Sequence, residues 1–566
     1  MSKENNRIVT ILAVSLTIVT VGGLLWFLGT ILGEAIWLLA KRNHQYATIE
    51  VSQNNTKERE KIKLSLVAGN ETFSGYSTIR HPEFKKMLAE KYGIDINYQK
   101  YDRDREIELF NNGEIDIWTT TLDRYLEEKP KGKIVGTIGR SIGADAIVID
   151  KAKYANFQST DAVHHLLRSK DSQNKPGIAY VNDSSSEYFA LALDDRIEEF
   201  NLKNFRTRQT NQEKETWQLL KNSRSNVAVG VVSEPYVTLA EKQGYEVLLS
   251  SQDFDKSIVH VIVASDRTLE VNPEKVIQFL EAYYYLIDRN VLEPVKIKEY
   301  IANESKISLE EAEKVLTKID FFTAVEARKW MQDGRLEASL DSVASILLKS
   351  GRIQEIPDNY QAFFTSEYLE RASTNTAKLI GELETTDPKL AERLAGIGQT
   401  IAIENNRDKT QDLEAEHTHE KSINRGKEKF SSETEHREQH QYLEEFKTTK
   451  LGNLKWSGKI VFEFGSAELN QQSIHVLQHV AEKISELNPE TVAIRVIGHT
   501  SKSGTLEANQ TLSQQRARAV VDVFQKRGLT HKFIAEGKGF NDPLPNYAPE
   551  DPKQQRTQII IERIRS

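Results

Sequence analysis

Polar residues gather between residues 492 and 518, where an alternating stretch gives way to a helical one. The alternation from Val492 to Val496 predicts a strand, which Gly498 ends. A polar loop from His499 to Gly504 follows, and then a helix whose apolar side begins at Leu512. A helix that starts where a strand ends presents free N–H groups, so this junction suits a small charged group.

Four other polar stretches stand where a predicted strand meets a predicted helix. The residues expected to contact a ligand there are Ser74, Gly75, Tyr76, Thr119, Thr120, Ser184, Ser185 and Glu234. Hydroxyls and free helix N–H groups suit an oxyanion or a zwitterion. The alternative is ordinary helix capping, because Ser and Thr are favoured at N-caps in any protein. Arg140 and Asp145, near a predicted crossing, could be hinge contacts or ligand partners.

Short apolar strands alternate with helical stretches from about Ile62 to Val263, which predicts an α/β unit with a mainly parallel sheet. Strands are expected at residues 62–67, 94–98, 134–138, 146–149, 177–180, 227–232 and 258–264. This order, over roughly Lys61 to Thr374, resembles the two-lobed substrate-binding proteins of ABC transporters, in particular the nitrate, sulfonate and taurine class. The run from Phe110 to Asp116 is similar to the stretch in which that family brings a strand to the cleft. The resemblance implies a periplasmic-binding-protein type II fold with a solute between its lobes.

The run that begins at Val492 resembles the signature of OmpA-like, peptidoglycan-associated domains. The matching residues are Gly498, His499, Thr500, Gly504, Asn509, Leu512, Ser513, Arg516 and Ala517. The resemblance implies an α+β sandwich in the order β-α-β-α-β-β. Its first strand is expected at Ile460–Phe464. It also implies that the domain binds peptidoglycan.

One position departs from that family's pattern. The resemblance implies a loop Asp that holds the ammonium of diaminopimelate and a helix Arg that holds its carboxylate. Arg516 matches the Arg, but Ser501 stands at the Asp position and Lys502 adds a positive charge. The residues expected at the peptidoglycan site are Thr500, Ser501, Asn509, Arg516 and Arg556. Because serine carries no charge, we expect weaker binding than the full pair gives.

The N-terminal segment from Ile8 to Gly33 has no charged residue. At ~1.5 Å per residue it is long enough for the ~30 Å core of a bilayer. A cleaved signal peptide is the alternative, but its apolar core is normally only ~7–15 residues. The chain has no cysteine, which excludes a lipoprotein anchor and all disulfides. We therefore expect one uncleaved transmembrane helix in the inner membrane, with the C-terminal bulk in the periplasm.

These patterns divide the chain into an anchor (1–42), a spacer (43–60), a binding-protein domain (61–382), a charged linker (383–452) and an OmpA-like domain (453–566). In the linker, His436 and His440 have the i, i+4 spacing of metal ligands. Their acid-rich, tether-like surroundings favour incidental exposed histidines. No metal and no cofactor are expected.

A net charge of −8 without a long basic tract argues against a nucleic-acid partner. The chain has no HExxH, GxSxG or P-loop motif, so we do not expect an enzyme. We expect a membrane-anchored periplasmic solute-binding protein for a small polar or anionic solute, placed at the cell wall by its OmpA-like domain. It would serve transport or sensing, with an ABC permease as a candidate partner. The alternative is an envelope tether or a MotB-like stator-type structural protein.

Overall fold

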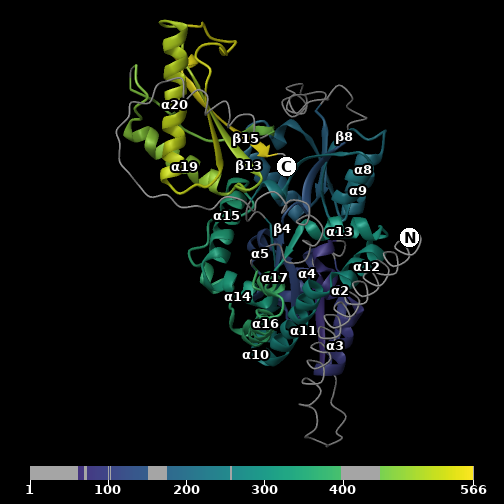
Figure 1. Cartoon of the computed structure of the whole chain (residues 1–566). Helices are drawn as coiled ribbons and strands as arrows, with labels where there is room; N and C mark the ends of the chain where they lie inside the picture. Colours follow the sequence, from purple (N-terminus) through teal and green to yellow (C-terminus); the bar gives the residue numbers. More distant parts are fainter. Residues whose placement is uncertain are drawn as a thin grey trace, which may run out of the picture. The chain divides into compact units, whose positions relative to one another are not determined.

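The computed structural model describes residues 62–68, 73–99, 101, 103–150, 175–254, 258–396, 447–463 and 465–564. All of them belong to one compact unit, residues 61–566 (Figure 1). The predicted membrane span, the spacer and the two linker histidines lie outside the described residues. Within the described ranges, no helix combines the length and the apolar character needed to cross a bilayer.

The first lobe is built around a six-stranded sheet with the order β11-β4-β10-β3-β1-β2. Its strands are β1 (Ile62–Ala68), β2 (Ile94–Gln99), β3 (Ile117–Thr121), β4 (Gly132–Ser141), β10 (Val259–Ser265) and β11 (Ile319–Phe321). Its first helices are η1 (Ser74–Tyr76), α2 (Ser77–Arg80), α3 (Pro82–Tyr92), α4 (Arg103–Asn111) and α5 (Leu122–Glu128). Strand β1 is parallel to β2 and β3, whereas β10 is antiparallel to β3 and β4.

The second lobe is built around a five-stranded sheet with the order β7-β6-β8-β5-β9. Its strands are β5 (Asp145–Ile149), β6 (Gly177–Val181), β7 (Arg206–Thr210), β8 (Val227–Ser233) and β9 (Glu246–Ser250). Its helices are α7 (Ser185–Arg196), η2 (Leu202–Asn204), α8 (Glu213–Lys221), α9 (Tyr236–Lys242) and η3 (Ser251–Asp253). Strand β6 is parallel to β7 and β8, whereas β5 is antiparallel to β8 and β9.

The chain passes between the lobes twice, from β4 to β5 and from η3 to β10. A strand that arrives from the other lobe enters its sheet at the edge where outgoing strands end, so it runs antiparallel to them. The mainly parallel sheet predicted from the sequence is therefore wrong, because both sheets are mixed. The ends of β3, β4, β6 and β8 and the starts of β5 and β10 face one region, which we call the interlobe seam.

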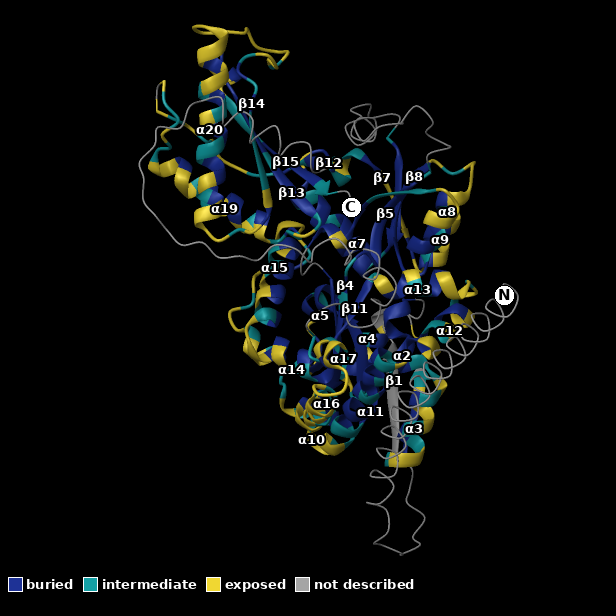
Figure 2. Ribbon diagram, viewed as in Figure 1, coloured by how far each residue is buried: buried dark blue, intermediate teal, exposed yellow. Residues whose placement is uncertain are grey.

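Helices that follow β10 cover the first lobe. They are α10 (Asp266–Val271), α11 (Pro273–Leu292), α12 (Pro294–Ser305), α13 (Leu309–Thr317), α14 (Ala324–Gln332), α15 (Arg335–Lys349), η4 (Tyr360–Phe363), η5 (Glu367–Leu369), α16 (Glu370–Leu383) and α17 (Pro388–Leu394). Local sequence fixes their ends: Ser308 and Glu311, for example, cap the start of α13 reciprocally. Helix α15 packs against both α5 and α7, so it contacts both lobes. Most of these helices bury one side and expose the other (Figure 2), whereas η4 has no buried residue.

The C-terminal domain has a four-stranded sheet with the order β12-β15-β13-β14. Its elements are β12 (Thr448–Asn453), α19 (Gln471–Ser485), β13 (Val492–His499), α20 (Leu506–Lys526), β14 (Lys532–Gly537), η7 (Pro552–Gln554) and β15 (Arg556–Ile564). The order β-α-β-α-β-β agrees with the prediction, but the first strand is β12. The strand predicted at residues 460–464 is wrong: over its described part, Phe462 makes only an isolated bridge to Leu469. Both α17 and β12 fall within the range predicted as linker.

Helix α20 packs closely on β13 and β14. A Cβ atom at Gly498 would collide with the carbonyl oxygen of Ser513, and one at Gly537 would collide with the backbone nitrogen of Gln514. Gly498 does not end the strand as predicted, because β13 continues to His499. Glycine is needed at these two positions because helix and sheet approach each other so closely.

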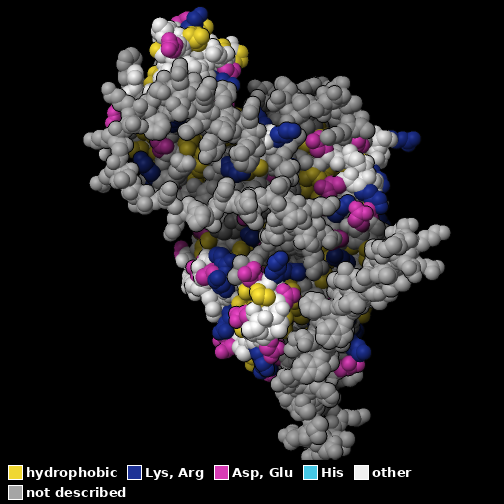
Figure 3. Space-filling model, in the orientation of Figure 1, with side chains coloured by type: hydrophobic (Ala, Val, Ile, Leu, Met, Phe, Trp, Pro, Cys, Tyr) yellow, Lys and Arg dark blue, Asp and Glu magenta, His cyan; other side chains and the backbone are white. Residues whose placement is uncertain are grey.

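Charged pairs join the C-terminal domain to the second lobe. The side chain of Arg196 is 1% exposed, and its Nη2 lies 2.8 Å from Glu486 Oε2. Arg563 Nε donates a 2.8 Å hydrogen bond to Asp253 Oδ1. Isolated bridges pair Ile197 with Leu454 and Phe254 with Leu487. Elsewhere on the described surface, basic and acidic side chains are interspersed on the face in view (Figure 3).

Candidate functional site

Asp145 stands at the interlobe seam as the first residue of β5 and is fully buried. Its Oδ1 accepts a 2.9 Å hydrogen bond from the hydroxyl of Ser185, which begins α7. Its Oδ2 has no hydrogen-bond partner in the structure described. Burial raises the pKa of Asp145 to about 6, although the hydroxyls of Ser141 and Ser185 oppose the rise. A buried carboxyl group with a free acceptor atom is unusual, and it suggests a missing partner.

His260, in β10, connects polar groups of the first lobe at the seam. Its Nδ1 lies 3.0 Å from the Tyr76 hydroxyl and its Nε2 lies 3.2 Å from Ser141 Oγ. The ring of Phe73 stacks on the imidazole with centroids 4.3 Å apart. Burial lowers the pKa of His260 to about 3, so the ring is neutral at pH 7 and brings no charge to the seam.

Asp123 supplies a second buried carboxyl group, from the first turn of α5. Its residue is 4% exposed, and burial, together with the charge of Glu127, raises its pKa to about 7. Asp145 contributes to this rise, and both carboxylates contribute to the raised pKa of Tyr76. The structure shows no ion pair for Asp123 or Asp145 in the described part of the chain. Two buried carboxyl groups therefore face the seam without a cation.

Glu234, in contrast, has a full set of partners. It lies at the end of β8, and its carboxylate accepts hydrogen bonds from Thr238 at 2.7 and 3.1 Å and pairs with Lys318 at 3.0 Å. Burial raises its pKa even though Lys318 opposes the rise. Its backbone carbonyl also accepts a 3.4 Å hydrogen bond from the backbone N–H of Ser74. Glu234 thus holds the two lobes together rather than offering a free acceptor.

The remaining residues predicted for the solute site differ in their roles. Ser184 caps α7, donating to Val181 O at 2.6 Å and accepting from the backbone N–H of Glu187 at 3.4 Å. Thr119 and Thr120 lie buried within β3, where they pair with β10. Ser74 is buried with an unpartnered hydroxyl, and Gly75 packs against the ring of Phe73.

The sequence reasoning missed Asp123, Tyr188, Glu213 and His260. Asp123 follows the Thr119–Thr121 run directly, so the run itself could have pointed to it. Glu213 Oε1 accepts from Ser186 and Ser233 at 2.6 and 3.1 Å, and burial raises its pKa to about 7. Among the described residues, no group of three or more potential ligands has a geometry that could hold a metal ion.

Arg352 bridges the lobes beside the seam. Its Nε donates to Glu127, on α5, at 2.8 Å. Its Nη2 bonds Asp183 and lies 3.5 Å from Glu187, both in the second lobe. The three carboxylates raise the pKa of Arg352 further above its usual value.

Arg516 forms the centre of a second polar site, in the C-terminal domain. Its Nε donates to Ser466 O at 2.9 Å and its Nη1 to Gln555 Oε1 at 3.1 Å. The guanidinium also lies 5.0 Å from the centroid of the Phe462 ring. Burial lowers the pKa of Arg516, and in the described part of the chain it makes no ion pair. Its positive charge is thus not neutralised by any acidic side chain that the structure describes.

Gln555 links Arg516 to Ser501, since its Nε2 lies 3.3 Å from Ser501 Oγ. The structure therefore brings Arg516 close to Ser501, which stands at the family's Asp position. Thr500 is buried beside them, with an unpartnered hydroxyl. Asn509 positions the loop, because its Nδ2 donates to two loop carbonyls at 2.7 and 2.9 Å. Arg556 is engaged elsewhere, donating to the carbonyl of Asp542 at 2.9 Å.

The geometry of this site agrees with a comparison of the chain with known proteins. Residues 461–557 match the OmpA family. The chain carries an OmpA-family domain at its C-terminal end. It is 32% identical over 101 residues to outer membrane protein A of Shimwellia blattae, covering 18% of this chain and 42% of that protein. It is 30% identical over 113 residues to outer membrane protein A of Klebsiella aerogenes, covering 20% and 32%. The chain thus spans less than half the length of these relatives.

Solved structures resemble the rest of the chain besides the OmpA-family domain. The periplasmic aliphatic sulphonate binding protein SsuA of Escherichia coli gives a TM-score of 0.41 at 13% identity, covering 54% of this chain and 92% of that one. The alkanesulfonate-binding protein SsuA of Xanthomonas axonopodis pv. citri, bound to MOPS, gives a TM-score of 0.40 at 11% identity, covering 53% of this chain and 96% of that one. The fold is a mixed α/β fold resembling periplasmic binding proteins, joined to an OmpA-family domain.

Proposed function

We propose that this chain is a cell-envelope protein that binds a small polar solute between its two lobes and contacts peptidoglycan through its OmpA-family domain. One observation carries the first half of this proposal. Buried polar groups from both lobes meet at the interlobe seam, and the carboxylate of Asp145 keeps a free acceptor atom there. A domain that served only as a tether would have no use for such a costly group, since unpaired buried polar atoms destabilise a fold.

The second half of the proposal rests on Arg516. An OmpA-family pocket takes the carboxylate of a peptidoglycan stem peptide, and a guanidinium that has no carboxylate partner among the described residues suits that group. Ser501 lies on the far side of Gln555 from this guanidinium. It offers a hydroxyl but no negative charge for the ammonium group of diaminopimelate. Binding through Arg516 alone would be weak.

The location and partners belong to the same proposal. The chain is anchored in the inner membrane by its N-terminal segment, and residues 61–566 lie in the periplasm. It has no catalytic activity and works with an ABC permease in uptake or with a sensing partner. What supports this is the long uncharged segment before residue 34, together with a fold that resembles periplasmic binding proteins.

The solute-binding half is tested by thermal shift on the full chain in detergent. The panel contains nitrate, sulfonates, amino acids and small organic cations. A ligand present at ~100 times its dissociation constant should stabilise the fold by ~2.7 kcal/mol. A flat response to the whole panel, at concentrations up to tens of millimolar, would reject solute binding.

The peptidoglycan half predicts that Ser501→Asp strengthens binding in a sacculus pull-down. A carboxylate here would meet the ammonium of diaminopimelate in a charge-assisted hydrogen bond, so affinity should rise ~10-fold, and added salt should reduce the gain. The matched control is Ser503→Asp, which adds the same charge to an exposed position of the same loop. Equal binding by both variants and the parent, with no loss in Arg516→Ala, would place the contact on another surface.

A further inference from the structure

The charge balance of the interlobe seam indicates what kind of solute it takes. Building on the proposed function, we infer that the solute is a compact organic cation, an ammonium group held between Asp123 and Asp145. These two carboxyl groups are 4% and 0% exposed and come from different lobes. A ligand that lies between them would contact both lobes at once, as a solute that stabilises the closed form must.

The basic residues around the seam are already paired. Each has its own carboxylate partner within the protein: Arg80 with Glu304, Arg124 with Glu106, Arg196 with Glu486, Lys318 with Glu234, and Arg352 with Glu127. His260 is neutral. An anion that entered the seam would therefore meet two carboxylates and no available positive charge, which disfavours it strongly in a buried site.

Three unpartnered buried atoms at the seam can accept a hydrogen bond from a donor, whereas Arg80 Nη1, also unpartnered among the described residues, belongs to a side chain already paired with Glu304. Asp145 Oδ2 can only accept a hydrogen bond when it is ionised, and it has no donor in the described structure. The buried hydroxyls of Ser74 and Tyr188 also lack partners, and both can accept from an ammonium N–H.

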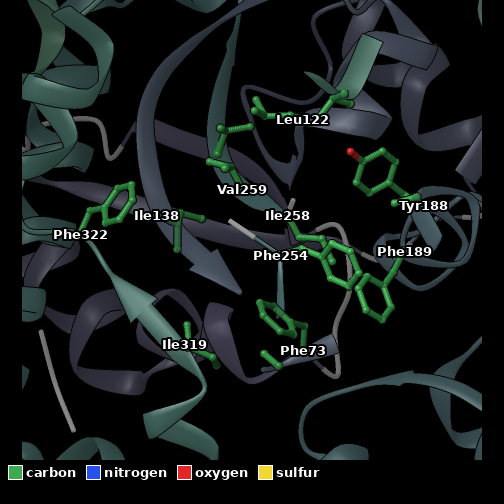
Figure 4. Close-up of a cluster of buried hydrophobic side chains, with 14 of the residues drawn as sticks. Phe73, Leu122, Ile138, Tyr188, Phe189, Phe254, Ile258, Val259, Ile319 and Phe322 are labelled. Atoms are coloured by element: carbon green, nitrogen blue, oxygen red, sulfur yellow. The ribbon is translucent and has the colours of Figure 1, made fainter. Parts of the chain in front are cut away.

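Aromatic rings lie around His260 at the same seam. Phe73 and Tyr76 pack edge to face with centroids 5.4 Å apart, next to His260. Figure 4 shows Phe73 and Tyr188 on either side of Ile258 and Phe254, with the Tyr188 hydroxyl directed towards Leu122, the residue before Asp123. Aromatic faces attract organic cations, most strongly in sites from which water is excluded.

The helix N-termini at the seam do not reverse this balance. Helix α5 carries Asp123 in its first turn, and α7 carries Glu187 there. The partial positive charge at each helix start therefore already faces a carboxylate of the protein. The sequence predicts a small polar or anionic solute, and this inference replaces that prediction with a cationic solute.

The test compares four probes by calorimetry on the full chain in detergent. Choline carries a compact cation, 3,3-dimethylbutan-1-ol is its uncharged carbon isostere, and methanesulfonate is a compact anion. Putrescine serves as a second cation with primary ammonium groups. We expect at least one cation to bind ~10- to 100-fold more tightly than the uncharged isostere, because the isostere lacks the positive charge that the carboxylates attract, and methanesulfonate not to bind.

Two variants locate the binding. Asp145→Asn and Asp123→Asn keep the side-chain shape and should each weaken cation binding ~10-fold or more. The matched control is Glu326→Gln, another buried carboxyl group with a raised pKa, whose charged neighbours Asp320 and Arg140 are not the seam carboxylates. It should leave the affinity unchanged.

A measurement on the unaltered protein avoids dependence on the variants. A cation that binds ionised carboxylates should release protons near pH 6.5, which is seen as a binding enthalpy that varies with the ionisation enthalpy of the buffer. Methanesulfonate binding without cation binding would overturn this inference and leave solute binding intact. Cation binding that neither aspartate variant weakens would also overturn it. If no probe or panel compound binds, both the inference and solute binding fail.

Discussion

The buried carboxylate of Asp145 is costly to the solute-free protein. Its pKa rises from 3.8 to about 6 on folding, because burial disfavours the charged form. Since the folded state binds the proton more tightly than the unfolded state, the cost is absent at low pH. It appears as the pH rises above about 4 and is complete above about 6. The groups that interact with Asp145 are Ser141, Ser185, Asp123, Glu213, Glu234 and Tyr76.

Asp145→Asn should therefore stabilise the solute-free protein at pH 8, by ~1–3 kcal/mol, and much less at pH 4. The asparagine keeps an acceptor for the Ser185 hydroxyl but no longer carries a charge. Thermal unfolding of parent and variant at the two pH values measures the difference. A variant that is less stable than the parent at pH 8 would contradict this account of the carboxyl group.

At the scale of elements, α5 and the second lobe are held together through Arg352. This side chain is 29% exposed, so each of its ion pairs is partly screened and contributes modestly. Together they favour the arrangement in which the lobes are in contact. A solute enclosed between the lobes would be retained longer when this bridge is present.

Arg352→Gln should weaken solute binding ~5- to 10-fold, chiefly through faster dissociation, with little change in melting temperature. Stopped-flow dissociation of the bound solute measures the rate. Arg335→Gln is the control, because its partner Asp333 lies two residues away in the same lobe. Equal dissociation rates in the two variants would show that the bridge does not hold the lobes.

Strands whose apolar residues form continuous buried runs were predictable from the sequence. Residues 134–138, 146–149 and 227–232 lie within β4, β5 and β8. Strand β7 was missed because its side chains are mostly exposed and polar, as in an edge strand, and β12 was missed for its lack of apolar alternation. Residues 460–464 alternate like a strand, but there the ring of Phe462 packs against Arg516.

The junctions of the candidate site could also be predicted, but not its charge. Serines and threonines at strand ends mark where a ligand could lie. The carboxyl groups of Asp123 and Asp145 become a pair only through the packing of two lobes. Whether Lys318 or Arg352 neutralises them is decided by contacts between residues far apart in the sequence. A single sequence holds no local signal for such pairing.

At the scale of the whole molecule, the contact between the second lobe and the OmpA-family domain depends on Arg196. Its partner Glu486 is 30% exposed and also accepts a 3.1 Å hydrogen bond from Ser342. Removing one member of a buried ion pair leaves the other charge buried without a partner. The resulting loss of folding stability is larger than the net stability that the intact pair contributes.

Glu486→Ala should lower the free energy of unfolding by ~2 kcal/mol and make the two domains separable by limited proteolysis. Glu482→Ala, on the same helix, is the control because this glutamate is 71% exposed and pairs only with a neighbouring histidine. Adding Arg196→Met to Glu486→Ala should restore much of the loss, since no charge then remains buried. An undiminished stability in Glu486→Ala would argue against a fixed contact.

The pairing of Asp253 with Arg563 adds a mechanical meaning to this contact. Asp253 lies in η3, directly before the segment that returns to the first lobe. The OmpA-family domain therefore contacts the second lobe next to one of the two crossings between the lobes. If peptidoglycan held that domain in place, the second lobe would be held with it, and the first lobe would be the one that moves. Binding of a solute would then displace the first lobe, which contains the first described strand, β1.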